Sequence, residues 1–278
     1  MSIQWDSGTE VATLDEGASR TPLLSVVDLG HAYGRLPNQT SVLVDVTFTV
    51  ERGEFVSVVG RSGAGKSTLL RCMAGLQRPI HGQVEIGGQR VDGPPAQLAL
   101  VFQDFSRSLL PWMSVGSNVE LPLKNRVPRH ERQARAERAL RSVGLEGTER
   151  RYPWQLSGGM QQRVAIARAL AYEPTVLLMD EPFAAVDAQT RADLEDLVIG
   201  IQKEFGLTAV FVTHDIDEAV YLADRVIVLS GAPTTVGEIV PIHLGRDRDQ
   251  LETKSEPAFM EARAHVLGLI RRAREQED

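Results

Sequence analysis

Short hydrophobic runs separated by polar breaks dominate the first part of the chain and predict strands. The runs 24–29 and 42–50 are rich in β-branched residues, and the polar stretch between them predicts an antiparallel hairpin with a long loop. A third run, 54–59, has the length and composition of a buried strand, and residues 68–74 then predict a helix that ends at Gly75. This change to a strand followed by a helix indicates parallel strands around a buried sheet.

The middle of the chain is predicted to be largely helical. Strands are expected at 82–88 and 98–102, after which residues 105–172 are mostly charged and helical. Within that stretch, one helix spans 129–143 and a second spans 159–172. These helices predict a small subdomain inserted between strands of the main sheet.

Strands and helices alternate again toward the end of the chain. The predicted segments are strands at 175–179, 208–213 and 225–229, a helix with one apolar stripe at 191–205, and a short helix at 217–224. Beyond Gly245 the chain is polar and then weakly helical over 257–272.

Composition narrows the classes of function. The chain has 278 residues, which is enough for an α/β core with an inserted subdomain. Its formal net charge of −7 lacks the overall basic character that is typical of nucleic-acid binding. Its single cysteine, Cys72, excludes a disulfide within the chain, which suits a reducing compartment. No apolar stretch approaches the roughly 18–20 residues that span a bilayer. The first residues are polar and acidic rather than signal-like, so we expect a cytosolic protein unless a partner holds it at a membrane.

A glycine-rich segment between the strand 54–59 and the helix 68–74 matches the phosphate-binding pattern G-x-x-x-x-G-K-[ST] at every fixed position. Its residues are Gly60, Arg61, Ser62, Gly63, Ala64, Gly65, Lys66 and Ser67. The glycines allow a tight turn whose N–H groups point at phosphate oxygens, and the following helix adds its positive N-terminal end. Lys66 is expected to reach the β- and γ-phosphates, and the Ser67 hydroxyl to bind Mg²⁺. A chance glycine-rich turn is the alternative, but the strand and helix on either side favour a nucleoside triphosphate site.

Two acidic residues follow the apolar strand near residue 176. Because ligands bind outside the carboxyl ends of strands in open parallel sheets, Asp180 and Glu181 are expected to face the phosphates. Asp180 has the character to hold Mg²⁺ through a water, and Glu181 could act as the general base on the attacking water. The alternative is a charge pair that only stabilises a helix N-terminus.

Two more polar residues follow apolar strands. An imidazole at His214 could hydrogen-bond the γ-phosphate and sense its loss, although a lone histidine is often only structural. Gln103 has a neutral side chain able to touch Mg²⁺ or water, and by itself it is a weak signal.

A second anion site is predicted at the start of the helix 159–172. Ser157 is a favourable N-cap residue, and Gly158 and Gly159 expose backbone N–H groups at a positive helix end. One triphosphate does not need two such cradles in one chain, so each cradle is expected to complete a site on another copy. A plain helix start is the alternative.

These elements, in this order, resemble the ATP-binding cassette (ABC) ATPases over nearly the whole chain. Residues 60–67 correspond to the Walker A loop, 176–181 to Walker B with its catalytic glutamate, and 156–160 to the signature. The single residues that match are Thr68 after the Walker A loop, Gln103 of the Q-loop, Asp187 of the D-loop, the switch histidine His214, and Tyr33, where the family places an aromatic residue that stacks on adenine. Met160 replaces the usual glutamine of the signature, and activity is expected to survive this change.

The resemblance implies an α/β P-loop NTPase fold, with an ABC-type ATPase core, an N-terminal antiparallel β-subdomain and an inserted helical subdomain. The ATPase domain would span 23–245 with the helical subdomain at about 105–172, between a flexible tail at 1–22 and a C-terminal helical extension at 246–278. The family also implies ATP and Mg²⁺ as cofactors. Its head-to-tail dimer holds each ATP between the phosphate loop of one chain and the signature of the other.

An apolar segment after Gln103 resembles the leucine-leucine-proline-tryptophan segment of importers of the nitrate/sulfonate/taurine type. Leu109, Leu110, Trp112 and Met113 are expected to line a groove that receives a short helix of a separate membrane subunit; the alternative is that they belong to the core of the helical subdomain. The resemblance implies transmembrane permease subunits, an extracytoplasmic solute-binding protein as an indirect partner, and a peripheral position on the cytoplasmic face of the inner membrane.

Other functions remain open at this point. The chain could serve an importer of a different small solute. A cassette ATPase of DNA repair is also possible, but such proteins carry long coiled coils or zinc inserts, and this chain has neither a sustained heptad nor a cysteine pair. A cassette acting in translation would normally carry two cassettes in one chain.

Overall fold

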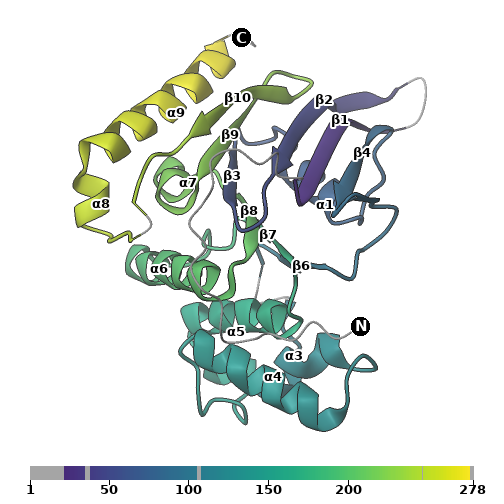
Figure 1. The fold of residues 1–278 in the computed structure, drawn as a ribbon, viewed down its shortest axis with the longest axis vertical. Coiled ribbons are helices and arrows are strands. Elements are labelled where there is room, and N and C mark those ends of the chain that lie inside the picture. Colours follow the sequence, from purple (N-terminus) through teal and green to yellow (C-terminus); the bar gives the residue numbers. More distant parts are fainter. Residues whose placement is uncertain (1–21, 35–37, 105–107, 246, 276–278) are drawn as a thin grey trace.

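The computed structural model describes residues 22–34, 38–104, 108–245 and 247–275. The tail predicted at 1–22 therefore lies almost entirely outside the described residues. These residues form two sheets and a set of helices that lies largely below and beside them in Figure 1. No helix in these ranges is long and apolar enough to cross a bilayer.

A small antiparallel sheet forms one side of the molecule. Its strands are β1 (Leu24–Tyr33), β2 (Thr40–Val50), β4 (His81–Ile86) and β5 (Gln89–Arg90), in the order β2-β1-β4-β5. The predicted antiparallel hairpin is confirmed, with Leu24 opposite Val50 and Val26 opposite Phe48. Strand β1 continues beyond the predicted end at residue 29, and Tyr33 is its last residue, paired with Thr40 of β2.

The larger sheet is mostly parallel. It contains β3 (Phe55–Val59), β6 (Leu98–Val101), β7 (Val176–Asp180), β8 (Thr208–Val212), β9 (Arg225–Ser230) and β10 (Thr235–Pro241), in the order β10-β9-β3-β8-β7-β6. All neighbours pair in parallel except β10, which runs antiparallel to β9. Strands β3, β7 and β8 are buried on both faces, as their continuous apolar runs predict. Strand β10 was not predicted, because Gly237 interrupts its alternation with a register shift.

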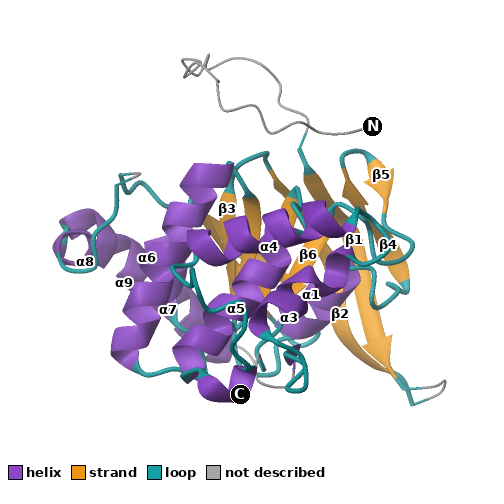
Figure 2. Ribbon diagram, turned by 90° about the horizontal axis from the view of Figure 1, so that it is seen from below, coloured by secondary structure: helices purple, strands orange, loops and turns teal. Residues whose placement is uncertain are grey.

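The helices fall into three groups. Those packed near the large sheet are α1 (Lys66–Met73), α6 (Ala188–Phe205) and α7 (Ile216–Leu222). The second group lies between β6 and β7 in the sequence: α3 (Val115–Glu120), η1 (Leu121–Leu123), α4 (Arg129–Ser142), η2 (Pro153–Gln155) and α5 (Gly158–Ala171). At the end of the chain come α8 (Glu252–Ser255) and α9 (Pro257–Glu275), which lie on the opposite side of the molecule from β4 (Figures 1 and 2).

Helix α6 begins earlier than the predicted residue 191. Asp187 caps it by accepting a hydrogen bond from Thr190 N at 3.0 Å, which starts the helix directly after the D-loop residue. Gly206 ends it in the left-handed conformation with φ 58°, as predicted.

Two hydrophobic clusters cover the two faces of the large sheet. Alternate residues of its strands point to opposite sides, so Val58 belongs to the cluster with α1 and the small sheet, whereas Val59 belongs to the cluster with the other helices. Phe259 and Val266 anchor α9 to the second cluster. Both cores therefore pack against the strands that end at the candidate site.

Candidate nucleotide-binding site

The glycine-rich segment connects the buried strand β3 to helix α1. Gly63 and Gly65 have φ angles of 83° and 69°, which lie in the left-handed region that favours glycine. A Cβ on Gly65 would also lie 2.7 Å from Val42 Cγ1 of β2, so both backbone angle and space exclude a larger residue. The loop therefore turns tightly and opens onto the N-terminus of α1, an arrangement suited to an anion.

Lys66 lies inside this loop. Its side chain is buried, and Nζ donates to the carbonyl oxygens of Gly60 and Arg61, each at 2.9 Å. Burial lowers the pKa of Lys66, while the nearby carboxylates of Glu181 and Asp180 act in the opposite direction. The loop thus holds a cation whose present partners are neutral carbonyls, and a phosphate oxygen would be a stronger acceptor for it.

The residue after Lys66 connects the loop to strand β7. Ser67 Oγ donates to Asp180 Oδ1 at 3.2 Å. Asp180 is buried at the end of β7, and burial, with a smaller contribution from Glu181, raises the pKa of its carboxyl against the opposing effects of Ser67, Arg71 and Lys66. A hydroxyl and a carboxylate side by side are the hard oxygen donors that Mg²⁺ prefers. In the described part of the chain, no group of three or more His, Cys, Asp or Glu side chains could hold a metal by itself.

Glu181, directly after β7, contacts side chains that follow the two neighbouring strands β6 and β8. Its Oε2 accepts a hydrogen bond from Gln103 Nε2 at 3.1 Å and lies 3.0 Å from His214 Nδ1, which must donate if the carboxylate is ionised. Strands β6, β7 and β8, which precede these residues, are parallel neighbours, so their carboxyl ends share one edge of the sheet. The fold therefore brings these three predicted residues together, and the contact that Gln103 makes is with Glu181.

The backbone at Glu181 is strained. Its φ angle is 41°, which an L-residue with a side chain rarely adopts. Its N–H donates to Val212 O at 2.8 Å, which fixes this conformation against β8. Such strain at a polar strand end is typical of a functional position, because the surrounding structure must hold it there.

Tyr33 lies at the other side of the loop, beside Thr68. Its hydroxyl is 3.0 Å from Thr68 Oγ1 and donates to Gln77 Oε1 at 3.2 Å. Gln77 Nε2 in turn is 2.7 Å from His31 Nε2, and His31 Nδ1 is 3.1 Å from Arg78 O, so Nδ1 carries the proton and Nε2 accepts. The hydrogen bond with Thr68 is the main cause of a lowered pKa for Tyr33. Sequence patterns gave no signal for Gln77 and His31, which join this side chain only through the tertiary fold.

The second glycine-rich helix start lies on α5. Ser157 caps this helix, because its Oγ accepts a hydrogen bond from Met160 N at 3.3 Å. The helix begins at Gly158 rather than at the predicted residue 159. At Gly159 a Cβ would lie only 2.4 Å from Thr190 Cγ2 of α6.

Thr190 connects this helix start to Asp187. Thr190 N donates to Asp187 Oδ1 at 3.0 Å and Thr190 Oγ1 donates to Asp187 Oδ2 at 2.7 Å. These two hydrogen bonds lower the pKa of the exposed Asp187 carboxyl. The signature residues and the D-loop residue are therefore neighbours on one surface. Helix α1 packs in the hydrophobic cluster on one face of the large sheet and α5 in the cluster on the other, so the two glycine-rich helices lie on opposite faces of that sheet.

The apolar segment after Gln103 divides between the core and the surface. Leu109 is only 2 % exposed and belongs to the core cluster, so the prediction that it lines an exposed groove is wrong. Trp112 is 72 % exposed, while Leu110 and Met113 are half-buried. Asn118 holds this turn: its Oδ1 accepts from Leu110 N at 2.8 Å, and its Nδ2 donates to Leu110 O and Met113 O at 3.1 Å. The turn is thus fixed from below and presents one large aromatic side chain to solvent.

Comparison with known proteins gives consistent matches. A family model described as "ABC transporter" matches residues 43–184. The chain is 43 % identical over 236 residues to the aliphatic sulfonates import ATP-binding protein SsuB of Bacillus licheniformis, covering 85 % of this chain and 89 % of that protein. It is 41 % identical over 258 residues to the taurine import ATP-binding protein TauB of Escherichia coli O157:H7, covering 91 % and 99 %. Among solved structures, the dimeric post-hydrolysis state of an ATP-binding cassette bound to ADP and Pi matches with a TM-score of 0.69 and 34 % identity, covering 80 % of this chain and all of that one.

Proposed function

The chain belongs to the ABC transporter family, and from this premise we propose that it is the ATP-hydrolysing subunit of a prokaryotic importer. The names of its relatives support import as the direction of transport, and the ADP- and Pi-bound neighbour supports ATP hydrolysis as the reaction. The observation that carries the proposal is the Glu181 carboxylate, which Gln103 and His214 hold at the shared strand edge beside the phosphate loop.

Each residue of the site has a distinct proposed role. The loop residues 60–68 bind the phosphates through their N–H groups and through Lys66. When ATP binds, its phosphate oxygens replace the loop carbonyls that Lys66 Nζ contacts in the free protein. Tyr33 stacks on the adenine ring. Glu181 takes a proton from the attacking water, and His214 hydrogen-bonds the γ-phosphate and keeps the Glu181 carboxylate in place.

Mg²⁺ is the proposed metal. Ser67 and Asp180 would hold it, since Mg²⁺ is usually bound by one or two protein oxygen ligands together with phosphates and waters. When bound, the ion neutralises charge that develops on the phosphates. Gln103 joins its water shell in this proposal.

The second glycine-rich helix start requires a partner. We infer that two cassettes pair head to tail, so that Ser157, Gly158, Gly159 and Asp187 of one chain complete the site of the other. The packing of α1 and α5 on opposite faces of the large sheet and the dimeric state of the solved neighbour support this arrangement. In this arrangement both cassettes are copies of this chain.

The membrane partners and the solute are proposed by analogy with the relatives. Permease subunits would hold the protein at the cytoplasmic face of the inner membrane, with Trp112, Leu110 and Met113 as contacts, and a solute-binding protein would act from the other side. The proposed solute is a small anion of the nitrate, sulfonate or taurine type, supported by the names of the sulfonate and taurine relatives. Another small solute is the alternative, whereas no observation favours DNA repair or translation.

The proposal is tested by Glu181→Gln. The amide cannot accept a proton from water, so hydrolysis should fall by roughly 10²–10⁴-fold while ATP binding persists. The variant should accumulate as an ATP-bound dimer on size exclusion. Glu238→Gln is a matched control, because Glu238 is also hydrogen-bonded by a histidine, His265 at 2.7 Å, but outside the site. Near-parental hydrolysis by Glu181→Gln would assign the base to another residue.

A further inference from the structure

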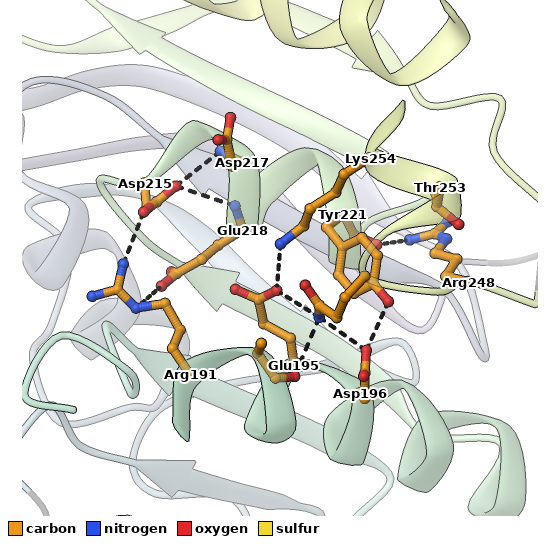
Figure 3. A network of polar contacts seen from close by, with 12 residues as sticks. Arg191, Glu195, Asp196, Asp215, Asp217, Glu218, Tyr221, Arg248, Thr253 and Lys254 are labelled. Carbon is orange, nitrogen blue, oxygen red and sulfur yellow. Dashed lines mark hydrogen bonds and ion pairs between the residues drawn. The ribbon is translucent and has the colours of Figure 1, made fainter. Parts of the chain in front are cut away.

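A polar network lies where helices α6 and α7 meet the C-terminal segment (Figure 3), and it includes Asp215, the residue after His214. Arg191, in the first turn of α6, approaches α7 from one side. Its Nη1 donates to Asp215 Oδ2 at 3.1 Å, and its Nε lies 3.4 Å from Glu218 Oε1. Arg191 therefore joins the helix that follows the D-loop to the helix that follows His214.

Both backbone neighbours of His214 belong to this network. Asp215 caps α7, with Oδ1 accepting from the N–H groups of Asp217 at 2.9 Å and Glu218 at 3.2 Å. On the other side, the buried Thr213 donates its hydroxyl to Glu218 Oε2 at 2.6 Å and accepts from Asp215 N at 3.0 Å. Glu218 bridges these two neighbours, and Arg191 contacts the carboxylates of both Asp215 and Glu218.

The side chain of His214 makes fewer contacts than the residues on either side of it in the chain. It is 62 % exposed, and the hydrogen bond to Glu181 is the contact that orients its ring. Whether the ring can reach Glu181 therefore depends on where Thr213 and Asp215 hold the backbone of His214. A shift of this turn by about 1 Å would be enough to misalign a catalytic group.

We propose that Arg191 is a positioning residue for His214: by clamping Asp215 and Glu218 to the start of α6, it holds the His214 turn at the reaction site. This inference rests on the proposed role of His214. Because Asp187 caps the same first turn of α6, the clamp also connects the D-loop, which faces the partner cassette in the proposed dimer, to the histidine.

The remaining network provides a control. Glu195 of α6 is also buried, and it is paired with Lys254 Nζ at 3.0 Å and with Gln250 Nε2 at 3.0 Å. This pair ties the C-terminal segment to α6 without touching a neighbour of His214. Lys254→Met leaves the hydrogen bonds of Thr213, Asp215 and Glu218 in place, so it should lower the melting temperature but change the hydrolysis rate per folded molecule far less than Arg191→Met does.

The test is single-turnover ATP hydrolysis by the full chain in a double-mutant cycle. Arg191→Met should lower the rate by roughly ten- to a hundredfold, with little change in affinity for a fluorescent ATP analogue. If Arg191 acts through His214, adding Arg191→Met to His214→Ala should cost nothing further. Arg191→Lys keeps the charge but loses the forked geometry, so it should recover part of the rate.

Several results would overturn the inference. Additive losses in the cycle would mean that Arg191 acts elsewhere, and a parental rate for Arg191→Met or for His214→Ala would remove its basis. Glu181→Gln, measured in the same series, reports on the proposed function separately. Loss of hydrolysis in Glu181→Gln with a parental rate in Arg191→Met overturns the clamp alone.

A pH profile of Glu218→Gln gives a second readout, which remains available if Arg191→Met does not fold. Burial raises the pKa of Glu218 to about 7, and the negative charges of Asp215 and Glu195 add to this, while Thr213 and Arg191 oppose it. As the pH rises through about 7, Glu218 loses its proton and its charge strengthens the contact with Arg191. The parent rate should therefore rise over this range, and the isosteric Glu218→Gln should lose that rise. An unchanged profile would contradict the clamp.

Discussion

At the scale of the residue, the buried ammonium of Lys66 indicates that a ligand of this site must supply negative charge. Its ammonium is buried and is satisfied by two backbone carbonyls of its own loop. Charged groups are rarely buried unless an opposite charge compensates them, and the carboxylates of Glu181 and Asp180 supply such charges here. An anion entering the loop would therefore meet a cation that is already desolvated and oriented.

Replacing Lys66 with Ala tests this expectation. Loss of a charge-assisted hydrogen bond of roughly 1.5–3 kcal/mol corresponds to an affinity reduced by about ten- to a hundredfold. A fluorescent-nucleotide titration measures it, and Lys203→Ala, which removes an exposed lysine paired with Asp247, serves as the control. Equal affinity for ATP in the parent and in Lys66→Ala would refute the assignment of the phosphate loop.

The sequence predicted which residues reach the site more fully than it predicted how they are held. Lys66, Asp180 and His214 could be placed because each follows a recognisable apolar strand or glycine pattern. The left-handed backbone of Glu181 and the clamp of Arg191 could not, because they depend on contacts between segments far apart in the chain. Leu109 was misplaced for the same reason: an apolar run does not reveal which of its residues the core will bury.

At the scale of the element, the contact between α5 and α6 sets the geometry of the second glycine-rich helix start. Gly159 and Thr190 are close enough that no side chain fits between the two helices. Thr190 also holds Asp187 through its hydroxyl, so one residue determines both the helix spacing and the D-loop contact.

This contact predicts a loss that a second substitution reverses. Gly159→Ala would force its Cβ against Thr190 Cγ2, and such overpacking typically costs about 1–3 kcal/mol. Thr190→Ser removes the methyl group but keeps the hydroxyl that bonds Asp187, so Gly159→Ala/Thr190→Ser should recover both the melting temperature and the hydrolysis rate. Gly200→Ala in α6, the helix that carries Thr190, is the control, because nothing lies within 4 Å of its Cβ position. Failure of the double variant to recover would show that the clash is not the cause of the loss.

Element boundaries were predictable where a local signal existed. Gly206 ended α6 as expected, whereas the start of α6 was placed too late because the cap at Asp187 was not recognised. The short helix α8 and the strand β10 were missed, since their apolar positions are too few or too irregular to stand out. The alternation of strand and helix, in contrast, depends on long apolar runs and correctly predicted the parallel sheet.

At the scale of the whole molecule, the exposed Trp112 is a residue whose position the cassette's own packing does not explain. It is 72 % exposed on a turn that Asn118 fixes by three hydrogen bonds to Leu110 and Met113. The turn follows Gln103, which contacts Glu181, so a partner bound at Trp112 would be connected to the reaction site through a short stretch of chain. This is the expected route by which closing on ATP would move a permease helix.

Trp112→Ala should therefore separate assembly from hydrolysis. Because the side chain is mostly in solvent, its removal should leave the melting temperature and basal ATPase of the isolated subunit nearly unchanged. A central Trp in an interface is often worth roughly 2–4 kcal/mol, so co-purification with the proposed permease subunits should be lost or much reduced. Leu251→Ala, which removes another exposed apolar side chain (82 % exposed) next to α8, should bind the permease normally. Normal permease binding by Trp112→Ala, or an equal loss in Leu251→Ala, would exclude Trp112 as the specific anchor. A lowered melting temperature together with lowered basal ATPase would instead assign the residue to the stability of the helical region.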